Sequence, residues 1–208
     1  MAARHEPPHP LAEQLAAAVG TDGELLDLGT GGGRNLRFLA QTHRALGVDD
    51  DAERAARVTA ALRADHLDVQ VAHAAYTQLP FAARRFSGCV ATHALLHGTR
   101  AKVRLAIAEA SRVMRSGSPF FLTLASVRDN RYGEGSMVEI DVFAPTSGDE
   151  AGVPHLYVDA GEVARLLAPH FSVVSLREVD ADAIAGRWAH GEGAAAGRRH
   201  WFVEARRR

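Results

Sequence analysis

Two hydrophobic patterns alternate along the chain. Short, mostly apolar runs such as "ELLDL" at 24–28 and "SPFFLTLAS" at 118–126 are typical of buried strands. Between such runs lie longer stretches, such as 50–64 and 100–114, in which apolar residues recur at the spacing of one helix face. Strands that alternate with helices imply right-handed crossovers and a parallel sheet covered by helices on both faces. The pattern therefore predicts an α/β fold.

The pattern assigns strands and helices to most of the chain. A leading helix is expected within 1–20 and should end at Gly20, because glycine suits a left-handed helix end. The last two strands flank a glycine- and alanine-rich stretch and are expected to pair antiparallel. The expected strands lie at 24–28, 44–49, 68–74, 85–95, 118–126, 171–179 and 200–206, and further helices at 34–43, 50–64, 100–114 and 159–168.

The alternation stops between residues 127 and 158. A compact domain seldom contains so long an irregular stretch unless it is a lid or a binding loop. We expect one domain over 1–208, because the chain is long for one small domain and short for two. Segment 127–158 is then the expected lid or acceptor loop of that domain.

Composition and charge indicate which partners and which cellular compartment to expect. A formal net charge of −1 and a pI near 6.8 give no overall field for nucleic acid or an anionic membrane. Charges and prolines interrupt the N-terminal segment where a signal peptide would be apolar, and no run reaches the roughly 20 apolar residues of a membrane span. The one cysteine, Cys89, lies in an apolar run and is expected in the core. We expect a cytoplasmic protein.

Glycines at 29, 31, 32 and 33 separate the first strand from the next helix. In doubly wound folds, the carboxyl edge of the central strands is where ligands bind. Glycine accepts positive φ and has no Cβ, so a ligand can lie against the backbone and reach the free N–H groups of the helix start. The glycine run predicts a ligand site at this edge, although a tight turn without a ligand would have the same composition.

Spacing and the next acidic residue decide between ligands. The order Gly29-x-Gly31-x-Gly33 is one residue tighter than the dinucleotide fingerprint, whose third glycine is replaced by Arg34. Asp49 ends the second strand about twenty residues later, where a carboxylate can accept hydrogen bonds from both hydroxyls of a ribose. Asp51 is expected to cap the following helix, and Asp50 suits either role.

Four segments in order resemble the class I S-adenosylmethionine-dependent methyltransferases. "LLDLGTGGG" is similar to their first motif and "ALGVDDD" to their ribose-binding strand end. "AAYTQLPFAARRFSGCVATHALLHG" and "EASRVMRSGSPFFLTLAS" resemble the segments around their fourth and fifth strands. The resemblance covers roughly residues 10–126. It implies a Rossmann-like doubly wound fold with a mostly parallel seven-stranded sheet and an antiparallel last strand.

The resemblance also implies a cofactor, S-adenosylmethionine, and the residues that bind it. Asp27 and the backbone from Gly29 to Gly31 would hold the methionine end. This chain departs from the family at Ala75, where an acidic residue commonly binds the adenine amino group, and at Ser87, where aspartate is usual. The implied cofactor-binding residues are Asp27, Gly29, Thr30, Gly31, Asp49, Asp50, Ala75, Tyr76 and Thr92.

Methyl transfer from a sulfonium mainly requires that donor and acceptor be aligned, and a base helps only where the acceptor loses a proton. His93 and His97 follow the fourth strand and are the candidate catalytic residues, although each could instead pack at the strand end. Their spacing could also suggest a metal pair on a helix. No third ligand at a persuasive distance accompanies them, so no metal site is expected.

The acceptor is expected to be a small molecule. After the fourth strand the chain reads "THAL" and lacks the Pro-Pro-aromatic segment of amino-directed DNA methyltransferases, and it has no basic domain. The sequence does not indicate the oligomeric state or the attacking atom. The candidate substrate-binding residues all lie in segment 127–158: Arg131, Tyr132, His155 and Tyr157.

Two other functions stay open. A nicotinamide-dependent oxidoreductase would use the same turn, but the third glycine and an evident hydride-site pair are missing. A non-catalytic cofactor-binding module of the same fold is suggested by Ala75 and Ser87. Methyl transfer to a physiological acceptor would exclude that module.

Overall fold

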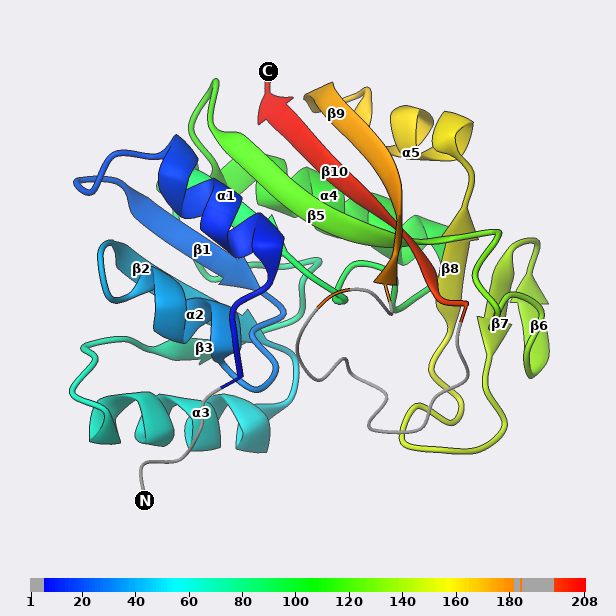
Figure 1. The fold of residues 1–208 in the computed structure, drawn as a ribbon, viewed down its shortest axis with the longest axis horizontal. Helices are drawn as coiled ribbons and strands as arrows, with labels where there is room; N and C mark the ends of the chain where they lie inside the picture. Colours follow the sequence, from blue (N-terminus) through cyan, green and yellow to red (C-terminus); the bar gives the residue numbers. More distant parts are fainter. Residues whose placement is uncertain (1–5, 182–183, 185–196) are drawn as a thin grey trace.

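The computed structural model describes residues 6–181, 184 and 197–208, and residues 1–5 of the expected leading segment lie outside them. Among the described residues the sheet has ten strands, three more than the sequence predicts, and seven of them form its main part in the order β3-β2-β1-β4-β5-β10-β9 (Figure 1). Neighbours from β3 to β5 pair parallel, whereas β10 is antiparallel to both β5 and β9. The strands are β1 (Glu24–Leu28), β2 (Arg44–Asp49), β3 (Val71–His73), β4 (Gly88–Ala91), β5 (Pro119–Ser126), β9 (Phe171–Asp180) and β10 (Arg199–Arg207). This sheet confirms the predicted fold class.

Helices cover both faces of the sheet. α1 (Pro10–Ala18), α2 (Arg34–Leu39) and α3 (Ala52–Ala64) share one apolar cluster with Leu25 and Val90. α4 (Arg100–Val113) and α5 (Ala160–Leu167) share another with Leu26 and Cys89. Neighbouring strand residues thus point to opposite faces, as the pleat requires. Among the described residues, no helix has the length and hydropathy needed to cross a membrane.

Segment 127–158 is not the irregular loop that the sequence predicts. It contains three strands, β6 (Ser136–Glu139), β7 (Val142–Ala144) and β8 (His155–Val158), of which β8 pairs parallel with Ala125 and Ser126. β10 pairs with β5 over 119–125 on one edge, so β8 takes the other edge, beyond the end of β4. All four β8 residues are buried, but so short a run shows no period in the sequence.

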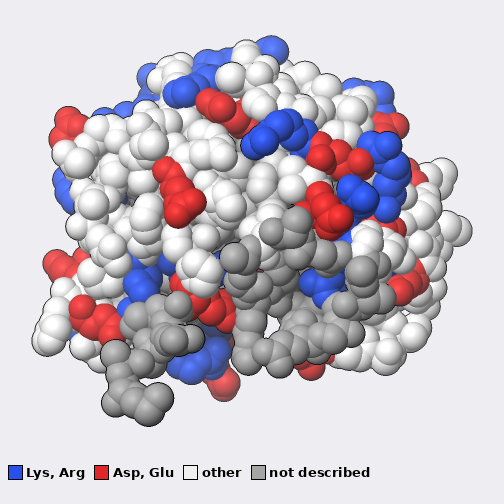
Figure 2. All heavy atoms as spheres, viewed as in Figure 1, with Lys and Arg blue, Asp and Glu red and all other residues white. Residues whose placement is uncertain are grey.

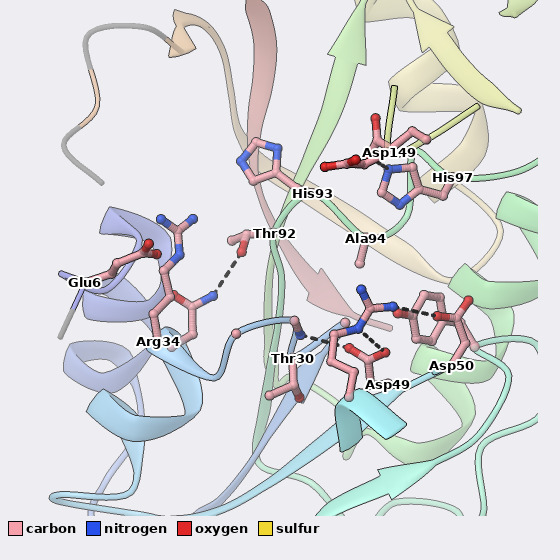
Figure 3. Close-up of a pocket in the computed structure, with 17 residues that line it drawn as sticks. Glu6, Thr30, Arg34, Asp49, Asp50, Thr92, His93, Ala94, His97 and Asp149 are labelled. Carbon is pink, nitrogen blue, oxygen red and sulfur yellow. Dashed lines mark hydrogen bonds and ion pairs between the residues drawn. The ribbon is translucent and has the colours of Figure 1, made fainter. Parts of the chain in front are cut away.

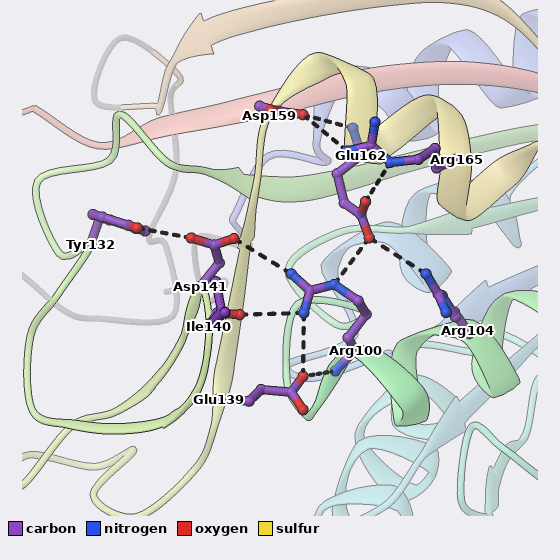
Figure 4. Close-up of polar contacts among 9 residues, drawn as sticks. All are labelled: Arg100, Arg104, Tyr132, Glu139, Ile140, Asp141, Asp159, Glu162 and Arg165. Carbon is purple, nitrogen blue, oxygen red and sulfur yellow. Dashed lines mark hydrogen bonds and ion pairs between the residues drawn. The ribbon is translucent and has the colours of Figure 1, made fainter.

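Arg100 fixes the β6–β7 hairpin to the rest of the molecule (Figure 4). Its side chain lies between Glu139 and Asp141 of the hairpin and Glu162 of α5, at N···O distances of 3.7, 3.5 and 3.0 Å. Its backbone N–H, at the start of α4, donates to Glu139 Oε1 over 2.8 Å. The hairpin is therefore held against two helices that cover the sheet.

Cys89 is fully buried on β4, as the sequence predicts for a core thiol. Burial raises the pKa of its thiol well above the usual range, with a smaller contribution from Asp27. The thiol therefore stays protonated and is a packing group rather than a nucleophile.

Candidate functional site

A cavity of about 430 Å³ opens at the carboxyl ends of β1, β2 and β4, where the strand order reverses (Figure 3). Nine residues singled out in the sequence line it: Gly29, Thr30, Gly31, Asp49, Asp50, Tyr76, Thr92, His93 and His97. Gly32, part of the predicted glycine run, also lines it, as do seven residues that the sequence did not predict there: Glu6, Arg34, Asn35, Arg54, Ala94, Asp149 and Glu150. The structure thus brings the glycine turn, the second strand end and the segment after β4 to one site.

The glycine turn meets protein on one side and open space on the other. A Cβ on Gly29 would lie 2.2 Å from the Cβ of Ala94, and the residue has φ +82°, so only glycine fits there. Gly31 has φ +53°, and a Cβ there would lie 3.9 Å from the nearest atom, the Gly29 carbonyl oxygen; a Cβ on Gly32 would meet nothing within 4 Å. Both residues line the cavity, so a ligand can lie directly against this backbone.

Asp49 joins the glycine turn to α3. Its side chain is 2% exposed; Oδ2 accepts from the Gly31 N–H over 2.9 Å, and Oδ1 accepts from the Asp51 N–H and from Arg54 Nε over 3.0 and 2.9 Å. A carboxylate offers about four acceptor positions, so one remains for a further donor such as a hydroxyl. This geometry suits the ribose contact that the sequence implies.

The next two aspartates have different surroundings. Asp51 caps α3 by accepting from the Arg54 N–H over 2.9 Å, which confirms the predicted cap. Asp50 lines the cavity, with Oδ1 3.9 Å from Arg54 Nη2. Arg54 had no sequence signal, because its position on the first turn of α3 becomes meaningful only once Asp49 is placed beside it.

Thr92 and Tyr76 lie on different walls of the cavity. Thr92 Oγ1 accepts from Asn35 Nδ2 over 2.9 Å, and Asn35 Oδ1 accepts from the His9 N–H over 2.9 Å, so the end of β4 is tied to α2 and to the residue that caps α1. Burial, with smaller contributions from Asp50 and Asp49, raises the pKa of Tyr76 well above its usual range. The Tyr76 hydroxyl therefore stays a neutral group that can donate.

Asp27 and Ala75 do not line the cavity. Asp27 is fully buried on β1, and burial raises the pKa of its carboxyl group to about 7, although Arg34 opposes the shift. Ala75 is exposed beside Tyr76. Contact of either residue with a cofactor stays a prediction.

His93 and His97 both reach the cavity from the segment that follows β4, opposite Asp49 (Figure 3). His93 has φ +55°, uncommon for a residue with a Cβ, and its N–H donates to Thr123 Oγ1 over 2.8 Å. His97 Nε2 lies 3.2 Å from Glu150 Oε1. Strained residues often occur at functional sites, so the His93 backbone supports a role that the sequence only suggests.

The four candidate substrate-binding residues of segment 127–158 do not line the cavity, whereas Asp149 and Glu150 of the same segment do. Arg131 Nη1 and His155 Nε2 lie 3.3 and 3.0 Å from Glu150 Oε2. Tyr132 and Tyr157 pack edge to face, with ring centroids 5.6 Å apart. Direct acceptor contact by these four stays a prediction, but two of them support a residue that does reach the cavity.

The family comparison agrees with this geometry. The sequence from 25 to 117 matches the family model described as "Methyltransferase domain". The matched residues, 25–117, make up less than half of the chain and are similar to a methyltransferase domain. The match includes the glycine turn, Asp49 and the segment after β4, and it confirms the resemblance seen in the sequence. No curated protein sequence matches the chain significantly.

Solved structures share the fold over nearly the whole chain. An S-adenosylmethionine-dependent methyltransferase from Methanosarcina mazei has a TM-score of 0.77 at 18% identity, covering 96% of this chain and 98% of that one. The 1,6-didemethyltoxoflavin-N1-methyltransferase of Burkholderia thailandensis, solved with 1,6-didemethyltoxoflavin and S-adenosylhomocysteine, has a TM-score of 0.68 at 21% identity, covering 95% and 76%. At these identities the likeness shows the fold.

A third neighbour shows that this fold does not by itself determine the reaction. The [4+2]-cyclase SpnF has a TM-score of 0.71 at 19% identity, covering 98% of this chain and 88% of that one. Because one fold serves both methyl transfer and cyclisation, the reaction of this protein has to be argued from its site.

Proposed function

We propose that this protein transfers a methyl group from S-adenosylmethionine to a small-molecule acceptor by in-line displacement. The observation that carries the proposal is one cavity with two chemically different walls. The glycine turn and Asp49 form one wall, and His93, His97 and Glu150 form the other. Such a cavity can align a donor with an acceptor, which is the main requirement of this reaction.

The residues present fit the cofactor. The open backbone at Gly31 and Gly32 can take the methionine end, and the remaining acceptor position of Asp49 can take a ribose hydroxyl. The hydroxyl of Tyr76 is a donor on the same wall. A volume of about 430 Å³ lies within the usual range for a small-ligand site. When bound, the cofactor supplies an electrophilic methyl group.

His93 and His97 are the groups available to receive a proton from an O–H or N–H acceptor. Both line the cavity, and Glu150 can orient His97 through their 3.2 Å contact. A base matters only where the proton leaves before or during transfer. The same wall would therefore accelerate attack by a hydroxyl or amine more than attack by a group without an acidic proton.

The net charge of the protein and the mixed charges on its surface favour a small-molecule acceptor over nucleic acid. On the face shown in Figure 2, acidic and basic side chains intermingle over a mostly uncharged surface. The formal net charge is −1. Nucleic-acid binding normally needs a basic patch or stripe to neutralise phosphates. One neighbour of the same fold acts on a small heterocycle, which supports a similar acceptor class here.

The test is calorimetric titration of the protein with S-adenosylhomocysteine, which can bind without an acceptor, and in parallel with NAD. We expect saturable binding of S-adenosylhomocysteine, weakened about tenfold or more in Asp49→Ala, because a buried hydrogen bond to a charged group contributes about 1.5 to 3 kcal/mol. Asp51→Asn is the matched control: it removes a neighbouring charge but retains a capping side chain.

The outcomes separate the competing functions. Binding of NAD with no binding of S-adenosylhomocysteine would replace the proposal with an oxidoreductase. Binding of S-adenosylhomocysteine followed by methylation of a member of a small-molecule panel would establish methyl transfer. Cofactor binding with no methylated product across a broad panel would favour a non-catalytic module or another reaction of this fold.

A further inference from the structure

We propose that His97, Glu150 and His155 bind a divalent transition-metal ion at the acceptor side of the cavity. One nitrogen from each histidine and one oxygen from the glutamate lie within 4.8 Å of one another. Nε2 of His97 lies 3.2 Å from Glu150 Oε1, and Nε2 of His155 lies 3.0 Å from Glu150 Oε2. Two imidazoles and a carboxylate on one side of an open position are a known ligand set for such ions.

The hydrogen bonds of His155 favour a cation in this cluster. Its Nδ1 lies 2.7 Å from the carbonyl oxygen of Val153, which can only accept, so Nδ1 carries a proton. In a neutral imidazole, Nε2 then presents a lone pair to Glu150 Oε2, which is also an acceptor. Two facing acceptors need either a second proton or a cation between them.

The contacts of His155 hold its ring in one orientation. The side chain is 3% exposed, and Arg131 Nη1 lies 3.3 Å from the same Glu150 oxygen, so the carboxylate is held in place as well. The bond from Nδ1 to a backbone carbonyl is the arrangement that usually orients a metal-binding histidine. A metal ion satisfies the lone pairs of both histidines and the carboxylate together.

The backbone holds the ligands in place. His97 and His155 form an antiparallel β-bridge, and the Leu156 N–H donates to the Leu96 carbonyl over 2.9 Å. The imidazole rings stand at 89° with centroids 4.8 Å apart, so the edge of one ring faces the other ring and the two do not stack. Glu150 comes from the loop that precedes β8. The site therefore combines the segment after β4 with segment 127–158.

The ligand types indicate which ions fit. Imidazole suits Zn²⁺, Fe²⁺, Co²⁺ and Ni²⁺, whereas Mg²⁺ and Ca²⁺ prefer oxygen ligands. His97 and Glu150 line the cavity, so a coordination position left open by three protein ligands would face it. If the proposed function holds, an acceptor oxygen or nitrogen bound there would lose its proton more readily, and His97 would act as a ligand rather than a base.

This site differs from the one weighed in the sequence. There His97 was paired with His93, and no third ligand was evident. Glu150 and His155 lie more than fifty residues further along the chain, and the pairing of the His97 and His155 segments brings them together in the fold. Spacing in the sequence therefore gave no indication of the cluster.

The experiment titrates Zn²⁺ alone, and separately Co²⁺ alone, into chelator-treated protein without cofactor or acceptor. Calorimetry gives the stoichiometry, and the visible spectrum of Co²⁺ reports nitrogen and oxygen ligation. We expect one ion per chain, with affinity at least roughly a hundredfold weaker in Glu150→Gln and in His155→Ala. His73→Ala, which removes an exposed histidine of β3, is the control and should bind as the wild type does.

Glu150→Gln keeps the side-chain shape and decides the question even if His155→Ala fails to fold. The proposal is overturned if the wild type shows no saturable binding, or if Glu150→Gln binds as tightly as the wild type. It is also overturned if His73→Ala loses binding to the same degree. Binding of S-adenosylhomocysteine does not enter this experiment, so failure of the metal site and failure of the proposed function are distinguishable.

Discussion

Asp27 carries the clearest single-residue prediction. Its folded-state pKa of about 7 lies above the value of 3.8 for a free carboxyl group, because burial disfavours the charged form. Between these two values the unfolded chain releases its proton while the folded chain keeps it, so stability falls as pH rises and levels off above about pH 7. Between pH 5 and pH 8 the wild type should lose about 2 to 3 kcal/mol relative to Asp27→Asn.

Urea unfolding of both proteins across this range measures the effect, and the difference between them cancels every other titrating group. A difference in unfolding free energy that does not change with pH would show that the folded protein already holds Asp27 ionised at pH 5. The same comparison with saturating S-adenosylhomocysteine would reveal whether a ligand changes the protonation of this carboxyl group.

An added methyl group should weaken ligand binding at Gly32 and lower the stability of the fold at Gly29. Gly32→Ala places a Cβ in open space at the cavity, so we expect S-adenosylhomocysteine to bind about tenfold more weakly with the unfolding free energy nearly unchanged. Gly29→Ala places a Cβ 2.2 Å from that of Ala94 at φ +82°, so it should lower the melting temperature. Calorimetry and thermal unfolding measure the two effects. Unchanged affinity in Gly32→Ala would place the ligand elsewhere.

At the scale of elements, residues of segment 127–158 hold Glu150, which lines the proposed acceptor side of the cavity. Arg131 pairs with Glu150, and the Tyr132 hydroxyl donates to Asp141 over 2.8 Å at the turn of the hairpin that Arg100 fixes. The Tyr132 ring also packs against Phe143, with centroids 5.2 Å apart. These contacts position Glu150 without touching the cofactor wall.

We therefore expect Arg131→Ala and Tyr132→Ala to lower kcat/KM for an identified acceptor about tenfold, while the Kd for S-adenosylhomocysteine stays within about twofold. Steady-state kinetics and calorimetry together check this. Tyr132→Phe keeps the ring and removes only the bond to Asp141, so it separates packing from hydrogen bonding. An equal loss of cofactor binding would remove the assignment of this segment to the acceptor.

At the scale of the whole molecule, the sequence predicts the seven-stranded sheet because its core strands are continuous apolar runs. β1 matches the predicted bounds 24–28, and β2 matches 44–49. The structure ends β4 at Ala91, four residues before the predicted end, because the apolar residues Ala94 and Leu95 pack into the core from a loop. Apolar burial alone does not distinguish a strand from such a loop.

The candidate site was predictable where its residues are close in sequence. Gly29 to Gly31 and Asp49 belong to local motifs, and the structure places them in one cavity. Arg54, Asp149 and Glu150 carry ordinary charges in ordinary positions, and only the packing of β8 and α3 gives them a role. The small-molecule acceptor and the cytoplasmic location stay predictions.

The shared edge of β5 has an evolutionary consequence. The chain leaves the sheet at the end of β5 and returns through β8 to the same edge, beyond β4, so residues between these points form an excursion with both ends anchored. Insertions, deletions or replacements within the excursion leave the pairing of the seven main strands intact. Under the proposed function, descendants of this protein can therefore change acceptors by remodelling segment 127–158 while the residues proposed to bind the cofactor stay unchanged.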